Sequence, residues 1–314
     1  MTADKYAYDP EFLDLIAVLP PQLADLSDPA SIREMRAGGL AEMIGERPDR
    51  DDVRKDARTV PGRAGAPDVP GRIYTPTAEV DGARGALVYI HGGGFMFGSI
   101  DMMDDACQTY AAEADAVIVS VEYRLAPEDP FPAGLVDCYA ALVWTAANAP
   151  ELGVDPARIG VGGGSAGGGL SAATALLARD RGGPALCFQF LQIPELDDRL
   201  QTPSMQTFTD TPLWNRPNAE WSWKHYLGAL HGSDDIPYLA APSRCPDLSG
   251  LPPAYITTRE FDPLRDEGIV YAMDLMRDGV QVELHAYPGT FHGSAMMQHA
   301  DVTQRDHNAS IRAI

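Results

Sequence analysis

The sequence predicts an α/β protein, with a mostly parallel central sheet flanked by helices. Short apolar, β-branched runs recur along the chain, and helical patterns separate most of them. Strands that alternate with helices pair in parallel, because each helix carries the chain back across the sheet. The chain has 314 residues, of which 45% are apolar and 22% charged, so it can bury a sizeable core as an ordinary globular protein.

The N-terminal part of the chain predicts helices followed by a connector. Residues 1 to about 45 carry apolar side chains at helical spacing, namely Phe12, Leu15, Ile16, Ile32, Met35, Leu40 and Met43. Residues 46–70 are rich in Pro, Gly, Asp and Arg, which favours a connector without regular structure. We therefore interpret residues 1–50 as a helical appendage to the main domain.

The main domain is predicted to contain alternating strands and helices from about residue 71. Strands are predicted over 86–90, 116–123, 157–161, 185–193, 254–258 and 280–287. Helices are predicted over 135–148, 166–180 and 265–278. The exception is a long segment, 195–250, which carries Trp214, Trp221 and Trp223 and is predicted to be helical from about 217 to 230. We interpret it as an insertion that divides the core into residues 51–194 and 251–314.

The charge of the chain excludes several classes of partner. A net charge of −21 would repel nucleic acid and anionic membranes. The chain has only three lysines, Lys5, Lys55 and Lys224. Two interpretations of this composition stay open: a GC-rich coding bias, and an adaptation to salt in which an acidic surface keeps the protein hydrated.

Neither a membrane segment nor a metal site is predicted. No run approaches the roughly 18 to 20 apolar residues of a spanning helix. The start, MTADKYAYDPEFLDLIAVLPP, lacks the basic region of a signal peptide, and Asp14 interrupts its apolar run, so we expect a cytoplasmic protein. The four cysteines are scattered without metal-ligand spacing, and we expect mostly buried, reduced thiols at Cys107, Cys138, Cys187 and Cys245.

A candidate nucleophile follows one of the predicted strands. The stretch Gly163-Gly164-Ser165-Ala166-Gly167 matches G-x-S-x-G, in which small residues allow a tight strand-to-helix turn and the serine hydroxyl points outward. A helix N-terminus also favours a developing negative charge. The alternative is a glycine-rich turn that is not catalytic or that binds a phosphate. The lysine of a P-loop is missing, and G-x-G-x-x-G fits less well because no acidic residue ends a strand about 20 residues later.

A catalytic serine needs a base to take its proton and a carboxylate to orient that base. Of the seven histidines, His292 follows the end of a predicted strand on a loop that can present it to the same sheet edge, whereas His91 opens the triple-glycine loop. Asp262 lies just beyond another strand, whereas Asp266 and Glu267 already belong to the next helix. The carboxyl ends of parallel strands meet at one edge of a sheet, so Ser165, Asp262 and His292 are predicted to come together.

The triple glycine in IHGGGF, residues 90–95, suits the negative charge that forms on an attacked carbonyl oxygen. Gly93 and Gly94 are predicted to aim their N–H groups at this oxyanion, with the N–H of Ala166 as a third donor. Side chains at these positions would block the close approach of the backbone. His91 is interpreted as a brace for this loop and not as a proton-transfer group.

Five motifs in this order resemble one known family. They are HGGGF at 91–95, YRLAPE at 123–128 followed by FPA at 131–133, GGSAGG at 163–168, DPLRDEG at 262–268 and FHG at 291–293. From about residue 70 to the C-terminus, the chain is similar to the bacterial hormone-sensitive-lipase family of carboxylesterases. The resemblance implies an α/β-hydrolase fold, with which the order serine, aspartate, histidine agrees. It also implies that residues 1–50 and 195–250 form a two-part helical cap.

Two details concern the surroundings of the predicted site. Members of the family often carry an acidic residue or threonine before the nucleophile, whereas this chain has Gly164, which removes a possible polar contact at the turn. Arg124, Glu128 and Asp137 are interpreted as a structural ion-pair network beneath the site.

The resemblance implies a serine carboxylesterase that hydrolyses short- to medium-chain esters through an acyl-enzyme, without a metal or an organic cofactor. Two alternatives stay open. One is another acyl hydrolase, such as an amidase or an aryl formamidase, because amide and ester hydrolysis use the same groups. The other is a non-catalytic ligand-binding receptor on the same fold, although no triad member is missing from this chain.

The size of the substrate depends on how the cap covers the site. The predicted walls of a covered pocket are Phe95, Met96, Phe97, Trp214 and Trp221, with Trp223 as a further candidate. Packing of cap against core is the competing interpretation for each of them. The expected partner is a small-molecule ester, and the arrangement of copies that the resemblance favours is a homodimer joined through the sheet edge or the last helix.

Overall fold

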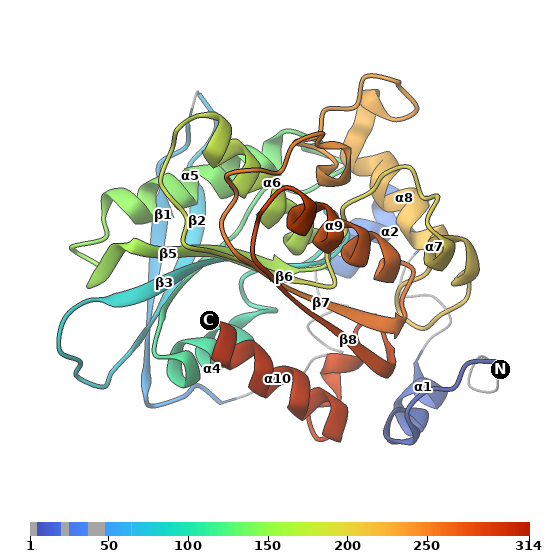
Figure 1. Ribbon diagram of the computed structural model, residues 1–314, viewed down its shortest axis with the longest axis horizontal. Helices are drawn as coiled ribbons and strands as arrows, with labels where there is room; N and C mark the ends of the chain where they lie inside the picture. Colours follow the sequence, from blue (N-terminus) through green and yellow to red (C-terminus); the bar gives the residue numbers. More distant parts are fainter. Residues whose placement is uncertain (1–4, 20–24, 37–47, 64) are drawn as a thin grey trace.

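The computed structural model describes residues 5–19, 25–36, 48–63 and 65–314, and its centre is an eight-stranded sheet (Figure 1). The strands lie in the order β1-β2-β4-β3-β5-β6-β7-β8. Their bounds are β1 Val53–Val60, β2 Val69–Pro76, β3 Arg84–Ile90, β4 Val117–Val121, β5 Val154–Gly164, β6 Phe188–Gln192, β7 Ala254–Phe261 and β8 Val282–Phe291. The strands from β3 to β8 pair in parallel, and β1 and β2 are antiparallel, which confirms the mostly parallel sheet.

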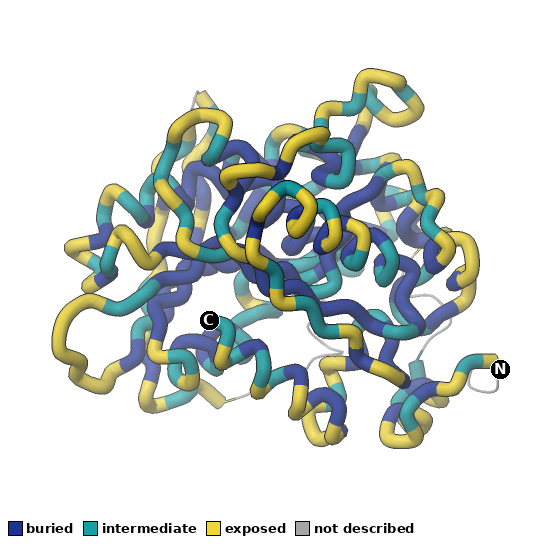
Figure 2. Tube along the Cα trace, in the orientation of Figure 1, coloured by how far each residue is buried: buried dark blue, intermediate teal, exposed yellow. Residues whose placement is uncertain are grey.

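Helices cover both faces of this sheet. Figure 1 shows α5 (Ala133–Ala147), α6 (Ala166–Asp180) and α9 (Arg265–Arg277) on one face, and α4 (Asp104–Ala114) and α10 (Asp301–Ala313) on the other. The predicted helices at 135–148, 166–180 and 265–278 correspond to the first three. The strands at the centre are buried between the two layers, as the dark trace in Figure 2 shows.

Small residues allow α6 to lie unusually close to the sheet. Thirteen of its residues are buried, from Ala166 to Ala178. A Cβ atom at Gly163 or Gly167 would lie 2.1 Å from the carbonyl oxygen of Ile90, a distance that no folded chain accommodates. The glycines of the G-x-S-x-G stretch are therefore required by the contact between the turn and β3.

The N-terminal segment and the segment 195–250, which is inserted between β6 and β7, lie together at one end of the sheet. The N-terminal part forms η1 (Pro10–Phe12), α1 (Leu13–Val18) and α2 (Pro29–Glu34), and residues 195–250 form α7 (Pro203–Thr207), α8 (Arg216–Leu227), η3 (Gly228–Leu230) and η4 (Pro242–Arg244). The helix predicted from 217 to 230 is confirmed by α8 and η3. Of the apolar residues that predicted N-terminal helices, Leu40 and Met43 lie outside the described residues. Figure 1 shows α2, α7 and α8 at the same end of the sheet.

Three expectations from the sequence are wrong or incomplete. The connector predicted over 46–70 contains β1 and the start of β2 instead. Because β1 is an edge strand, only its two end residues, Val53 and Val60, are buried, so it lacks the alternating apolar pattern of a strand. Helix α4 was not anticipated. Of the four free cysteines only Cys107 and Cys138 are buried, since Cys187 lies exposed just before β6.

Among the described residues, none of the helices has the length and apolar character needed to cross a membrane.

Candidate active site

Ser165 occupies a strained turn between β5 and α6. Its φ of 57° and ψ of −123° are rare for a residue with a side chain, and the surrounding hydrogen bonds hold them. The Ser165 N–H donates to the carbonyl of Gln192 at 2.9 Å, and its own carbonyl accepts from Gly169 and Glu195, both at 3.0 Å. The turn is thus fixed to the end of the neighbouring strand β6.

His292 and Asp262 are joined directly at the ends of the last two strands. Asp262 follows β7, His292 follows β8, and the distance from His292 Nδ1 to Asp262 Oδ2 is 2.8 Å. The other carboxylate oxygen accepts from the N–H of Leu264 at 2.9 Å. The Asp262 carboxylate is completely buried, so its two partners fix both its position and that of the imidazole.

The glycine loop after β3 lies against the Ser165 turn. A Cβ atom at Gly92 would lie 2.7 Å from the carbonyl oxygen of Gly164 and 3.4 Å from Cβ of Ser165. Gly93 and Gly94 have φ of 121° and 56°, which glycine adopts without strain. Within the part of the chain that the structure describes, the N–H groups of these two glycines donate to no acceptor. Ala166 opens α6, so its N–H also lacks a helical acceptor.

His91 braces this loop from beneath. Its ring is completely buried, stacks on Tyr123 with 4.2 Å between ring centroids, and bonds through Nδ1 to the carbonyl of Gly92 at 2.9 Å. The Tyr123 hydroxyl donates to the carbonyl of His91 at 3.0 Å. Burial lowers the pKa of His91 to about 4, so the ring is neutral at physiological pH and serves as a support, as its position in the motif predicted.

Trp214, from the segment 195–250, connects the glycine loop to the histidine. A Cβ atom at Gly94 would lie 2.5 Å from Cη2 of the indole, and the indole lies 5.7 Å from the ring of His292 between centroids. The indole therefore stands beside both the predicted base and one predicted oxyanion donor.

The other predicted pocket residues mainly pack the core against the N-terminal segment and the segment 195–250. The Phe95 ring stacks on Tyr226 with 3.9 Å between centroids, and Trp223 packs against it. Met96 and Phe97 are buried in one cluster with two N-terminal residues, Leu26 and Ile32, and Trp221 packs against the same cluster. These contacts agree with the competing interpretation of cap against core, whereas Trp214 contacts the site itself.

The predicted ion-pair network contains Arg124 and Asp137 but not Glu128. Arg124 Nη2 lies 2.8 Å from Asp137 Oδ1, and its Nη1 lies 3.8 Å from Asp129. Glu128 instead pairs with Arg33 and Arg36, each at 2.8 Å. This correction could not be made from the sequence, because both partners of Glu128 lie about 90 residues away in the N-terminal segment.

One buried carboxyl beside the site was missed. Glu195 lies just after β6, is completely buried, and its N–H donates to the carbonyl of Ser165. Burial, together with the charge of the neighbouring Asp262, raises the pKa of Glu195 to about 8. The available signal was an acidic residue three positions after an apolar strand, in the stretch QIPEL.

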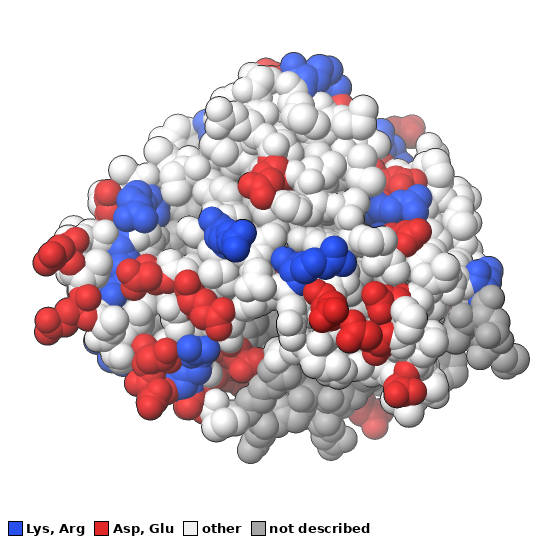
Figure 3. Space-filling model, turned by 60° about the horizontal axis from the view of Figure 1, so that its bottom comes forward, with Lys and Arg blue, Asp and Glu red and all other residues white. Residues whose placement is uncertain are grey.

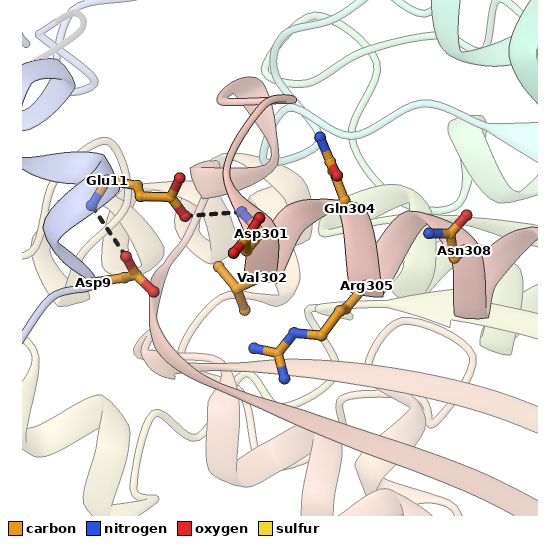
Figure 4. A pocket seen from close by; sticks show the side chains of 7 residues that line it. All are labelled: Asp9, Glu11, Asp301, Val302, Gln304, Arg305 and Asn308. Carbon is orange, nitrogen blue, oxygen red and sulfur yellow. Dashed lines mark hydrogen bonds between the residues drawn. The ribbon is translucent and has the colours of Figure 1, made fainter.

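Two hollows elsewhere on the molecule contain none of these residues. One, of about 570 Å³, lies between the N-terminal segment and α10 (Figure 4), and its lining residues are Asp9, Glu11, Asp301, Val302, Gln304, Arg305 and Asn308. The other lies at the turn after β2. Among the described residues, no group of three or more histidine, cysteine, aspartate and glutamate side chains could hold a metal ion.

Comparisons with known proteins converge on one type of enzyme. A family model described as alpha/beta hydrolase fold matches residues 87–296. Carboxylesterase NlhH of Mycobacterium tuberculosis is 46% identical over 244 residues, which cover 77% of this chain and 76% of that protein. Esterase LipI of the same organism is 38% identical over 294 residues, 93% of this chain and 89% of that protein. A solved structure titled Bacterial Heroin Esterase superposes with a TM-score of 0.93 and 48% identity, covering 98% of this chain and 96% of the other.

Proposed function

The chain belongs to the alpha/beta hydrolase fold family, within its hormone-sensitive-lipase-like carboxylic ester hydrolases, and from this premise we propose that it hydrolyses short- to medium-chain esters through a serine triad. Ser165 is the nucleophile, His292 the general base, and Asp262 the residue that orients the base. The observation that carries this assignment is the 2.8 Å contact between His292 Nδ1 and a fully buried Asp262.

The roles follow from the tautomer that this contact selects. Because Nδ1 donates to Asp262, Nε2 of His292 is free to accept a proton. It takes the proton of the Ser165 hydroxyl as the oxygen attacks the ester carbonyl, and the resulting imidazolium is stabilised by the Asp262 carboxylate. His292 then protonates the leaving alcohol, and a water molecule repeats the same steps on the acyl-enzyme.

The negative charge on the attacked oxygen is met by the N–H groups of Gly93, Gly94 and Ala166. Fixed donors of this kind typically contribute several kcal/mol to lowering the barrier, about 3 to 4 for one donor. What supports their role is that the two glycine N–H groups have no other acceptor among the described residues, and that the loop lies against the turn of Ser165.

The nucleophile is tested by replacement and by covalent labelling. Ser165→Ala should lower ester hydrolysis by several orders of magnitude and abolish labelling by an organophosphonate, while the melting temperature stays close to that of the native protein. Labelling that persists on another serine would refute the assignment. Parallel rates on a matched ester and amide would show which acyl compound is preferred, and an amide rate equal to or above the ester rate would favour an amidase.

The substrate range is proposed from the segments that cover the site. We infer that residues 1–50 and 195–250 form a cap, because the His225 ring bonds to the carbonyl of Leu26 at 2.7 Å and so ties α8 to the N-terminal segment. A covered apolar pocket gains about 0.8 kcal/mol per buried methylene until the acyl chain meets its wall. Trp214 is the residue best placed to form that wall, because its indole lies beside the base.

Activity on p-nitrophenyl esters should therefore be highest for acyl chains of roughly four to six carbons and fall sharply by about twelve. Trp214→Ala should move this maximum to longer chains, whereas Trp221→Ala, a matched change in the segment 195–250, should leave it in place. A rate that rises through long chains, with activation at an oil–water interface, would contradict the covered pocket.

A further inference from the structure

A buried carboxyl stands next to the catalytic groups without a role in the proposed reaction. The backbone of Glu195 is bonded to that of the nucleophile: the N–H groups of Glu195 and Gly169 both donate to the carbonyl of Ser165. A Cβ atom at Gly169 would lie 2.1 Å from the carbonyl oxygen of Glu195, so the two stretches of backbone are in tight contact. The position of Glu195 relative to Ser165 is therefore fixed.

The surroundings of this side chain do not suit a charge. Glu195 is completely buried, and neither of its carboxyl oxygens has a hydrogen-bond partner among the described residues. Among the described residues, no lysine, arginine or histidine forms an ion pair with Glu195. Burying an unpaired carboxylate is so costly that such a group keeps its proton instead.

The groups around Glu195 come from several elements, and the titratable ones are all acids or phenols. Asp262 faces it from the end of β7, and its charge opposes ionisation of Glu195. Burial raises the pKa of Glu267 on α9, Tyr226 on α8 and Tyr123 after β4, and a charge on Glu195 raises each of them further. Each of these titratable groups therefore disfavours a negative charge on Glu195.

Ser222 is a polar residue between Glu195 and the glycine loop, Gly92–Gly94, which is the oxyanion loop of the proposed reaction. The Ser222 hydroxyl on α8 lies close enough to the Glu195 carboxyl to lower its pKa, although the two do not form a hydrogen bond. The same hydroxyl donates to the carbonyl of Gly94 at 3.1 Å. Ser222 is completely buried, so it cannot exchange these neighbours for water. The three residues form a line from the interior to the loop that is to bind the oxyanion.

We propose that Glu195 is a positioning residue that works as a neutral acid: it supports Ser222, which holds the Gly94 peptide of the oxyanion loop, and its ionisation switches the site off. This inference rests on the proposed ester hydrolysis. An ionised Glu195 would place a second negative charge beside Asp262 and close to the developing oxyanion, which raises the barrier. The pKa of about 8 puts the change within reach of a pH profile, with the active, protonated form present below it.

The first test compares Glu195→Gln with the native enzyme over roughly pH 6 to 10, with a short-chain ester and correction for spontaneous hydrolysis. The native kcat should fall as the pH rises through about 8, by up to about tenfold per pH unit. The amide of Gln stays neutral, so this alkaline fall should be absent from the variant. Glu195→Ala removes the support altogether and should lower kcat at neutral pH by about tenfold, with a smaller change in KM.

The second test leaves Glu195 in place. The Ser222 hydroxyl lowers the pKa of Glu195, so Ser222→Ala should move the alkaline fall to higher pH. It should also lower kcat, because the Gly94 carbonyl loses its donor. This variant keeps the test open if the Glu195 variants do not fold.

Glu267→Gln is the matched control, since Glu267 is also a buried carboxyl, but its Oε1 accepts from the N–H of Leu196 at 2.6 Å, away from the oxyanion loop. It should keep the native alkaline fall. The proposal is overturned if Glu195→Gln keeps the native fall, or if Glu267→Gln removes it. A native enzyme without ester hydrolysis at neutral pH would instead refute the proposed function.

Discussion

Two buried carboxyls follow neighbouring strands of the same sheet, and their surroundings differ completely. Asp262, after β7, is bonded through one oxygen to His292 and through the other to the N–H of Leu264. Glu195, after β6, is equally buried and has no partner for either oxygen among the described residues. Burial alone therefore does not decide the charge of a carboxyl: partners permit a carboxylate at one strand end, and their absence favours a neutral acid at the next.

The largest effect is expected at the partnered carboxyl. Asp262→Asn keeps the size of the side chain but removes the acceptor that selects the His292 tautomer, so turnover should fall by about 10⁴-fold. Asp266→Asn is the matched control, because Asp266 only pairs with Arg265 and accepts from the N–H of Ser204. Steady-state kinetics on one ester would check both, and a larger loss at Asp266 would show that the wrong aspartate is assigned.

The glycine loop beside Ser165 provides the second test. Gly94→Ala would place a methyl group 2.5 Å from Trp214 and strain a backbone with a φ of 56°, which displaces a proposed oxyanion donor. We expect kcat to fall by about 10²- to 10³-fold. Gly82→Ala is the control, since Gly82 has a φ of 96° on a turn with no atom within 4 Å of the added methyl. Equal losses in both variants would point to backbone strain and not to the oxyanion loop.

A third prediction concerns how the carboxyl of Glu195 changes the free energy of unfolding with pH. In the unfolded chain the pKa of Glu195 has its ordinary value of 4.5, whereas in the folded protein it is about 8. The stability that Glu195 contributes is therefore fully present below about pH 4.5 and is lost as the pH rises through 8. Glu195→Gln should gain stability relative to the native protein from pH 5 to pH 8, on the order of 2 to 4 kcal/mol.

Denaturant unfolding at pH 5 and pH 8 would measure this difference. Glu151→Gln is a control on the surface, where Glu151 is exposed to solvent, and it should show no such change between the two pH values. A stability difference that is the same at both pH values would mean that Glu195 is ionised in the folded protein already at pH 5.

The smallest effect on activity is expected when salt screens the exposed carboxylates. On the face shown in Figure 3, many acidic side chains are exposed, some of them beside an arginine or lysine. With a net charge of −21, molar NaCl should screen their mutual repulsion, so activity is kept or modestly raised. The measurement is activity and melting temperature from dilute buffer to about 1 M salt, where the screening length is about 3 Å. A steady loss of both would leave the coding-bias interpretation of the composition.

Features that depend on a short stretch of chain could be predicted from the sequence. The G-x-S-x-G turn requires small residues because of its own steric limits, and the structure gives Ser165 the strained backbone that this motif implies. Strand ends and helix starts near Asp262 and His292 were also found within a few residues. These signals are local, since periodicity and glycine spacing reflect the backbone conformation of the stretch itself.

Features that depend on residues far apart in the chain were decided only by the tertiary structure. The edge strand β1 is stabilised by hydrogen bonds to β2 and not by its own apolar pattern, and Glu128 finds its arginines in the N-terminal segment. The state of Glu195 follows from the same cause. The sequence determined that an acidic residue follows β6, but packing of α6, α8 and the end of β7 around it decided that this residue is buried without a partner. A carboxyl's charge depends on the atoms within a few ångströms, and those atoms belong to segments that only folding brings together.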